Sequence, residues 1–346
     1  MTQNGENGDG GRMKRAVLAA VCAMAVSAAL WGCGGGTKDA DIQGNGAESA
    51  DAAGDDGVSG QREMDAGQES GGTAQEAAGT AAEDGGDMAQ GNAETDGVQG
   101  GEETAAQLAG TSFSVLGDSI STYQGSNPVG YYAFFPENGE VADVEDTWWQ
   151  RVADDLELTL YVNGSSSGAT VAGDSTGTAD PQCGCNELRT NDLSGPEGAC
   201  PDRVVIYLGT NDMLKAIPLG DNDGTGLVEE GVVETFSDAY TLMLDKVQAN
   251  YPLAEIYCCT LLPVGDYGTD TPYVEFVNGE QLTSADYGEA VARIAGSRGL
   301  PVIDLSDCGV TIENLHEMTS DGVHPTAAGM RCIAEAVEEA FAGPRQ

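Results

Sequence analysis

His324 stands three residues after Asp321 in a 346-residue sequence that contains only two histidines. An imidazole is the usual general base near neutral pH, and a neighbouring carboxylate can orient the ring and stabilise its charged form. A serine hydroxyl becomes an effective nucleophile when such a base accepts its proton. The pair therefore predicts serine-dependent chemistry, provided that the fold brings a serine to His324.

Three serines are candidates for the nucleophile. Ser119 lies three positions after the end of the apolar run 113–116, which is typical of a buried strand. Ser166 has the G-x-S-x-G spacing of a nucleophile elbow, but 169–181 is rich in Gly, Thr and Asp and does not predict the helix that an elbow requires. Ser175 repeats the Gly-Asp-Ser string without a convincing strand before it. These patterns favour Ser119.

Strand and helix patterns alternate in the carboxyl-terminal two-thirds of the chain. Short apolar runs predict buried strands over 113–116, 158–162, 203–208, 255–261 and 301–305. Amphipathic stretches predict helices over 146–156, 229–250, 285–298 and 327–341. This alternation favours a parallel sheet that helices cover on both sides. Ligands of such sheets bind beyond the carboxyl ends of the strands.

Four blocks of small and polar residues occur along the chain, at 116–121, 163–170, 209–212 and 321–325. Together they resemble the SGNH (GDSL-type) hydrolase superfamily. The resemblance implies a three-layer α/β/α fold of flavodoxin-like type with a five-stranded parallel sheet. It implies that Ser119 is the nucleophile of a triad with Asp321 and His324. It also implies that Gly168 and Asn211 complete the oxyanion hole. Residues 121–125, the Trp148–Trp149 pair and 290–305 further resemble a bacterial branch of the superfamily.

The predicted oxyanion hole has a physical basis beside this resemblance. Negative charge that develops on an acyl oxygen is stabilised by hydrogen-bond donors that are already in place. The backbone N–H groups of Ser119 and Gly168 and the side-chain amide of Asn211 would supply three donors. Glycine at position 168 would leave room for the substrate oxygen to approach the backbone.

Other residues near these blocks have simpler interpretations. His316 is expected to be a loop residue near the site entrance, because the sequence lacks the His and Cys spacings that are typical of metal sites. We therefore expect neither a metal nor a cofactor. Asp212 is expected to stabilise a turn. Trp148 and Trp149 could line an acyl or sugar pocket, although burial of one ring against the sheet is favoured.

The first 110 residues predict a targeting signal and a tether. A basic pair at 14–15, an apolar stretch at 16–30 and Cys33 resemble a bacterial lipoprotein signal over 1–33, with Met13 as the expected start and Cys33 as the lipidated residue. Residues 34–110 are acidic, rich in Gly and Ala and free of aromatic residues, which predicts a disordered tether. The hydrolase domain is then 111–346. We expect export, with Cys33 as the only membrane contact.

Charge and cysteine content bear on two further questions, whether the protein binds nucleic acid and whether it contains a disulfide. The chain has 57 acidic and 14 basic residues and a net charge of -43, which excludes binding to nucleic acid through a basic surface. In an exported protein, one disulfide from Cys200 to Cys183 or Cys185 is expected, with the pairing left open.

These features predict a cell-surface serine ester hydrolase that removes acyl groups, such as acetyl, from glycans or small esters through an acyl-enzyme on Ser119. The acidic surface disfavours anionic substrates. One alternative is a lysophospholipase or thioesterase, favoured if 213–227 and 266–282 form a long apolar slot. The other is a non-catalytic surface binding lipoprotein, which would lack the Ser, Asn or His of the site. We expect a monomer.

Overall fold

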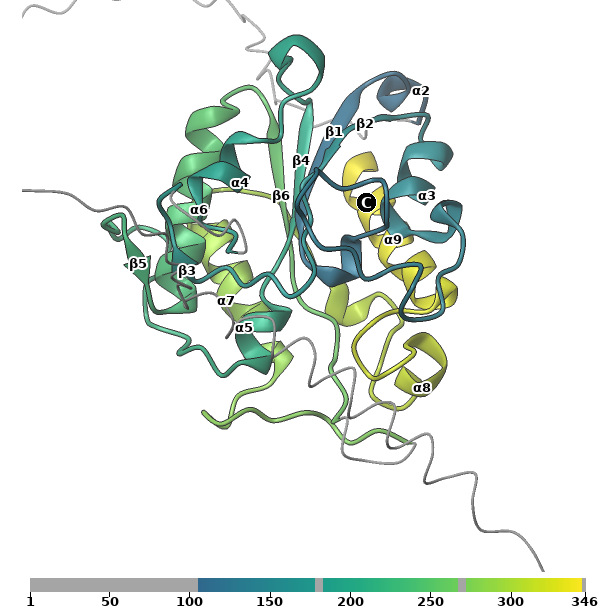
Figure 1. The fold of residues 1–346 in the computed structure, drawn as a ribbon, viewed down its shortest axis with the longest axis vertical. Helices are drawn as coiled ribbons and strands as arrows, with labels where there is room; N and C mark the ends of the chain where they lie inside the picture. Colours follow the sequence, from purple (N-terminus) through teal and green to yellow (C-terminus); the bar gives the residue numbers. More distant parts are fainter. Residues whose placement is uncertain (1–104, 178–182, 267–271, 344–346) are drawn as a thin grey trace, which may run out of the picture. The chain divides into compact units, whose positions relative to one another are not determined.

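The computed structural model describes residues 105–177, 183–266 and 272–343 (Figure 1). The predicted signal peptide with Met13 and Cys33, and the predicted tether as far as residue 104, lie outside the described residues.

A five-stranded parallel sheet forms the centre of the domain. Its strand order is β2-β1-β4-β6-β7. The strands are β1 (Ser112–Gly117), β2 (Thr159–Asn163), β4 (Arg203–Tyr207), β6 (Glu255–Cys259) and β7 (Val302–Ile303). Every residue of β1 and β4 is buried, as expected for central strands that are covered on both faces. The predicted sheet and all five predicted strands are confirmed.

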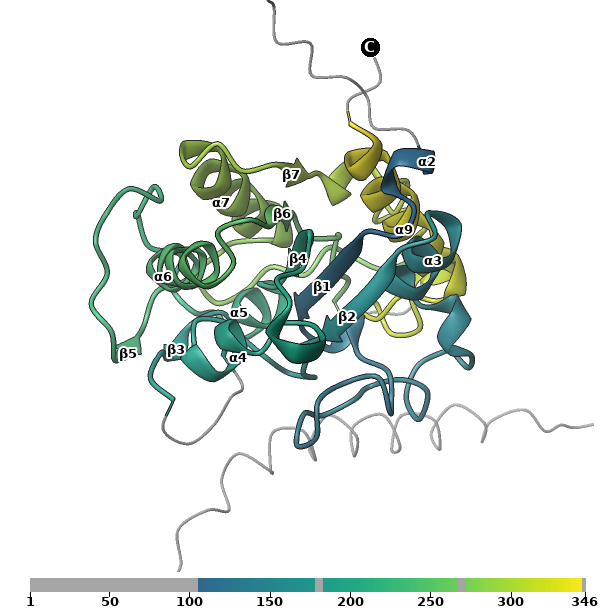
Figure 2. The same cartoon turned by 90° about the horizontal axis from the view of Figure 1, so that it is seen from above.

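Helices cover both faces of the sheet (Figures 1 and 2). One layer holds α2 (Ala105–Leu108), α3 (Trp148–Asp155) and α9 (Ala327–Ala342), and the other holds α4 (Glu187–Asn191), α5 (Thr210–Leu214), α6 (Phe236–Asn250) and α7 (Ser284–Ser297). The predicted three-layer α/β/α class is confirmed. None of the helices in the described part of the chain is long and apolar enough to cross a membrane.

Short elements connect these layers. The helix α8 (Leu315–Met318) precedes α9, and the two-residue strands β3 (Gly173–Asp174) and β5 (Val232–Val233) pair in an antiparallel ribbon. Single 3₁₀ turns are η2 (Ser119–Ser121), η3 (Val144–Asp146), η4 (Pro196–Gly198) and η5 (Leu305–Asp307). The turn η2 directly follows the central strand β1, so the first polar block lies at the carboxyl edge of the sheet.

The predicted helix over 229–250 is too long at its amino end. The α6 helix begins at Phe236, because the Thr235 side chain accepts a hydrogen bond from the backbone N–H of Asp238 and caps it. The preceding Val232 and Val233 pair with β3 instead. A β-branched pair fits an extended strand better than a helix.

The folded part begins before the predicted boundary at Thr111. The α2 helix precedes this position, and its Leu108 side chain is completely buried in the core. The backbone N–H of Gly110 donates a hydrogen bond to the carbonyl of Glu157. The prediction of a tether that extends to residue 110 is therefore wrong for the described residues from 105 onward. One apolar side chain in an acidic, Gly/Ala-rich stretch was too weak a signal.

The predicted disulfide of Cys200 is also wrong, because all seven described cysteines are free. Cys200 precedes β4 at the amino edge of the sheet, where the neighbouring Asp202 accepts hydrogen bonds from Ser112. Cys183 and Cys185 are buried on either side of Gly184, which packs against Leu208 beyond the opposite end of β4. A five-residue strand spans about 16 Å, far more than a disulfide can bridge.

We expect Leu108→Ala to lower the free energy of unfolding by about 2–5 kcal/mol, because it leaves a cavity in the core. Urea denaturation monitored by circular dichroism measures this change. Leu253→Ala removes the same side chain at a position that is 85% exposed, and it should change stability by less than about 0.5 kcal/mol. Equal stabilities for the two variants would show that α2 is not part of the folded core.

Candidate active site

The nucleophile candidate lies at the carboxyl end of β1, where η2 begins. Asp118 caps this 3₁₀ turn by accepting a hydrogen bond from the backbone N–H of Ile120 (3.0 Å). Ser119 follows and is 6% exposed. The buried interior strand β1 thus places the serine hydroxyl at the edge of the sheet where ligands of parallel sheets bind.

Ser119, His324 and Asp321 form one hydrogen-bonded chain. The distance between Ser119 Oγ and His324 Nε2 is 2.9 Å, and that between His324 Nδ1 and Asp321 Oδ2 is 2.8 Å. An imidazole that donates from Nδ1 to the carboxylate leaves Nε2 free to accept the serine proton. This arrangement has the geometry of a nucleophile, a general base and an orienting carboxylate.

The Asp321 carboxylate is held in its charged form. Burial raises the pKa of Asp321, but hydrogen bonds from the His324 ring and from backbone N–H groups outweigh this effect and lower it below the ordinary value. Asp321 Oδ1 accepts from the N–H groups of Val323 (3.0 Å) and His324 (2.8 Å). The turn between the two residues contains Gly322, whose φ of +90° is a conformation that favours glycine. The local turn therefore brings the carboxylate back to the imidazole.

The predicted oxyanion residues Gly168 and Asn211 lie after the carboxyl ends of β2 and β4. Asn211 lies on α5 after β4, and its Nδ2 is 3.4 Å from Asp118 Oδ2. Gly168 follows β2 in a loop in which the Ser167 N–H donates to the carbonyl of Tyr132. An added Cβ at Gly168 would meet no protein atom within 4 Å, and φ is +78°, a backbone conformation that favours glycine.

Two charged groups support this donor set, and the sequence patterns predicted no role for either. Asp118 is completely buried, and burial raises its pKa to about 6, although the Ile120 N–H and the charges of His324 and Arg189 lower it in part. Its Oδ2 is the acceptor that faces Asn211. Lys215 Nζ donates to the carbonyl of Gly168 (2.9 Å). Both residues lie in or near the four polar blocks of the sequence. Their roles were not predictable from the sequence, because only their contacts in the structure distinguish them from the polar residues around them.

The competing serines lie elsewhere. Ser166 is fully buried, and its Oγ accepts a hydrogen bond from the backbone N–H of Tyr132 (3.3 Å). Ser175 is also buried, and its Oγ accepts from the N–H of Gly231 next to the β3–β5 ribbon. Neither hydroxyl contacts a histidine within the described residues.

Asp212 and His316 also have other partners. Asp212 accepts hydrogen bonds from the backbone N–H groups of Val171 (2.7 Å) and Ala172 (3.0 Å), and so ties the start of α5 to the loop that follows Gly168. Burial raises the pKa of Asp212 to about 7, against the effect of these bonds. His316 lies on α8, where its Nε2 is 3.6 Å from Glu317. No group of three or more His, Cys, Asp or Glu side chains in the described ranges could hold a metal ion.

Both tryptophans are buried, so the packing interpretation of the Trp148–Trp149 pair is correct. Trp148 Nε1 donates to Ser121 Oγ (3.0 Å), and Trp149 Nε1 donates to the Ser121 carbonyl (2.9 Å). The two rings therefore fix the end of η2, two residues after Ser119.

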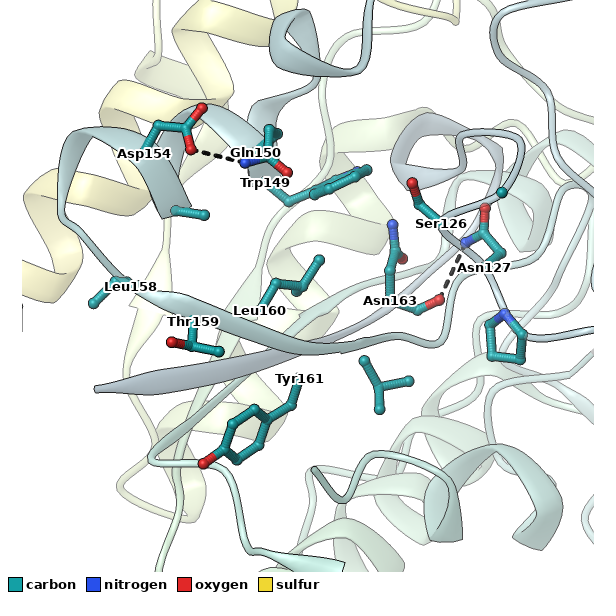
Figure 3. Close-up of a pocket in the computed structure, with 14 residues that line it drawn as sticks. Ser126, Asn127, Trp149, Gln150, Asp154, Leu158, Thr159, Leu160, Tyr161 and Asn163 are labelled. Carbon is teal, nitrogen blue, oxygen red and sulfur yellow. Dashed lines mark hydrogen bonds between the residues drawn. The ribbon is translucent and has the colours of Figure 1, made fainter. Parts of the chain in front are cut away.

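A groove of about 660 Å³ lies between α3 and the edge strand β2 (Figure 3). Its lining includes the polar side chains of Gln150 and Asn163. Asn127 lies at one end and donates from Nδ2 to the carbonyls of Asn163 (3.1 Å) and Ser165 (3.0 Å). Asn127 thus links the groove to the segment that leads into Gly168.

The sequence and the geometry agree with one family. Residues 111–265 match the family model of the GDSL-like lipases/acylhydrolases. This match supports the assignment of the folded domain to the SGNH superfamily. The matched range contains Ser119, Gly168 and Asn211 and ends before Asp321. The domain is therefore a serine ester hydrolase.

Several solved structures are also similar to this chain. A GDSL-like lipase from Bacteroides uniformis ATCC 8492 is 25% identical, with a TM-score of 0.50 over 69% of this chain and 98% of that one. A GDSL-like lipase from Bacteroides ovatus ATCC 8483 is 26% identical, with a TM-score of 0.48 over 67% and 98%. A protein from Lactobacillus plantarum shares the fold at 21% identity, with a TM-score of 0.51 over 69% and 100%. No curated protein matches the sequence.

The buried carboxylate of Asp118 makes the stability of this GDSL-like domain depend on pH. Its pKa is about 6 in the folded state against an ordinary value of 3.8, so the folded state binds the proton more tightly. The associated stability is present below pH 3.8 and is lost as the pH rises through 6. We expect Asp118 to add about 1–2 kcal/mol to the free energy of unfolding between pH 7.5 and pH 5.

Asp118→Asn should remove this contribution, as measured by urea denaturation at both pH values. The pKa of Asp212 is raised to about 7, so this residue also makes the free energy of unfolding fall as the pH rises. In Asp118→Asn the dependence of the free energy of unfolding on pH should therefore be reduced but not abolished. Asp143→Asn, at an exposed position, is the matched control and should keep the full slope. The same slope in Asp118→Asn as in the parent would contradict the assignment.

Proposed function

We propose that Ser119 is the nucleophile of this ester hydrolase, with His324 as general base and Asp321 as the orienting carboxylate. The observation that carries the proposal is the 2.9 Å distance between Ser119 Oγ and His324 Nε2. The hydroxyl already donates toward the base, so attack on a carbonyl requires no rearrangement of the three side chains.

The reaction would proceed in two halves. In the first, Ser119 Oγ attacks the ester carbonyl while His324 Nε2 takes the hydroxyl proton and passes it to the leaving alcohol. An acyl-enzyme on Ser119 remains. In the second, His324 takes a proton from water, the hydroxide attacks the acyl-enzyme, and the proton returns to Ser119 as the acid leaves.

The tetrahedral oxyanion of each half-reaction would bind to the N–H groups of Ser119 and Gly168 and to Asn211 Nδ2. Two contacts support this assignment. Lys215 bonds to the Gly168 carbonyl and so restricts rotation of this part of the loop. Asp118 Oδ2 orients the Asn211 amide. Donors that are fixed in advance need not reorganise as the charge develops.

As substrates we propose short acyl esters, such as acetyl esters, on neutral glycans or small alcohols. The net charge of -43 repels anionic surfaces. Polar side chains in the lining of the groove beside β2 would suit a hydroxyl-rich group better than an alkyl chain. A monomer is sufficient for this chemistry.

The alternative lysophospholipase or thioesterase needs a long apolar slot in the loops after α5 and β6. The described residues of these loops direct several apolar side chains onto the core, among them Ile217, Leu219, Phe276 and Leu282. Asn278 is buried in the second loop, where its Oδ1 accepts from the N–H groups of Glu280 and Leu282. This packing favours short acyl groups.

Ser119→Ala should lower kcat for p-nitrophenyl acetate by at least about 10³-fold, because the nucleophile is removed while the site is otherwise kept. The release of p-nitrophenolate, followed by absorbance at about 400 nm for the parent and the variant, measures the effect. Ser166→Ala is the matched control, and it should retain activity within about a factor of three.

Two measurements identify the substrate class. Among p-nitrophenyl esters from acetate to palmitate, the acetate should have the highest kcat/KM. An acetylated neutral oligosaccharide should release acetate with the parent protein but not with Ser119→Ala. A maximum at long chains would favour the lipolytic alternative. Equal rates for the parent and Ser119→Ala would remove the proposed nucleophile.

We further propose that the protein is exported and anchored to the outer face of the cytoplasmic membrane through a lipid on Cys33. The basic pair, the apolar stretch and the cysteine support this location. The acidic segment between Cys33 and the domain would then separate the active site from the membrane surface.

Cys33→Ala should move the protein from the detergent phase to the aqueous phase in Triton X-114 partitioning of bacterial cells that express the full chain. The reason is that the lipid supplies the membrane affinity. Mass spectrometry should find a diacylated amino-terminal peptide that begins at Cys33 in the parent. An unmodified Cys33, or peptides from residues 2–12, would contradict the anchor or the start at Met13, respectively.

A further inference from the structure

We propose that Phe134 is a positioning residue that stabilises the protonated form of His324 during catalysis. The Phe134 and His324 rings are stacked, with centroids 3.5 Å apart and planes at 10°. Phe135 approaches the same imidazole edge-on, with centroids 6.4 Å apart and planes at 81°. One face of the proposed base is thus covered by an aromatic ring from a segment that no motif identifies.

The position of Phe134 is tied to the nucleophile turn. Its backbone N–H donates to Thr122 Oγ1 (2.8 Å), and that hydroxyl donates to the carbonyl of Ser119 (2.9 Å). The next peptide is also fixed, because Gln124 N–H donates to the Phe135 carbonyl (2.8 Å). A ring held by the same turn as Ser119 keeps the imidazole in line with the hydroxyl.

The stack acts differently on the two protonation states of His324. The face of an aromatic ring is negative, so it attracts an imidazolium more strongly than a neutral imidazole. His324 becomes an imidazolium when it accepts the Ser119 proton. The ring therefore stabilises the transition state more than the resting enzyme, which is the condition for faster chemistry.

Other charged groups act on the same imidazole. Asp321 bonds to Nδ1, and buried Asp118, next to Ser119, interacts with His324 through its charge. Both carboxylates also favour the imidazolium, so the Phe134 contribution must be separated by changing the ring alone. Phe134→Leu keeps an apolar cover over His324 and removes the aromatic face. Phe134→Tyr keeps the face.

The inference rests on the proposed catalytic role of His324, and the experiment separates the two. For p-nitrophenyl acetate, Phe134→Leu should lower kcat by about 2- to 25-fold with little change in KM. The acid limb of the kcat/KM profile should move to lower pH by about 0.4–1.5 units, because the imidazolium is less stable. Phe134→Tyr should keep kcat and the acid limb of the kcat/KM profile at the values of the parent.

Tyr132→Leu is the matched control, since it removes an exposed ring of the same loop that is not stacked on His324, and it should leave the acid limb in place. A Phe134→Leu variant with parental kcat and acid limb would overturn the inference. So would a loss confined to longer acyl chains, which would make Phe134 a wall of the acyl site. An active Ser119→Ala variant would instead overturn the proposed function. Thermal unfolding of each variant confirms that it is folded.

Discussion

The contact between Ser119 Oγ and His324 Nε2 joins residues that lie 205 positions apart, and most of the domain is needed to make it. Ser119 is placed by the central strand β1, and His324 by the turn before α9. The two meet because parallel strands end at a common edge, where the following loops converge. Burial of β1 and β4 and the two tryptophan hydrogen bonds to Ser121 keep this edge rigid.

Three carboxyl groups lie around this edge in a protein that is already strongly acidic. Asp118, Asp212 and Asp321 each accept backbone N–H bonds. For Asp321 these bonds and the imidazole outweigh burial, whereas burial dominates for Asp118 and Asp212. The carboxylate that faces the base is thus the one that stays charged most readily.

The predictions that succeeded depend on local patterns. Apolar runs marked the five strands, and the order of strands and helices indicated the parallel sheet. The unsuccessful ones depend on distant contacts or on weak signals. The expected disulfide joined cysteines from opposite edges of the sheet, and Leu108 packs into the core from a stretch with the composition of a tether. The α6 helix starts later than predicted because Val232 and Val233 pair with strand residues that lie 58 and 60 positions earlier in the chain.

By itself, the sequence determined the fold class, the four polar blocks and the short turn that joins Asp321 to His324, because each depends on residues close together in the chain. Only the tertiary structure decided which serine meets the imidazole, how Asp118 faces Asn211 and where Phe134 lies. These contacts span from 93 to 205 residues for the polar pairs. They depend on the packing of whole layers, and such packing leaves no periodic trace in the sequence.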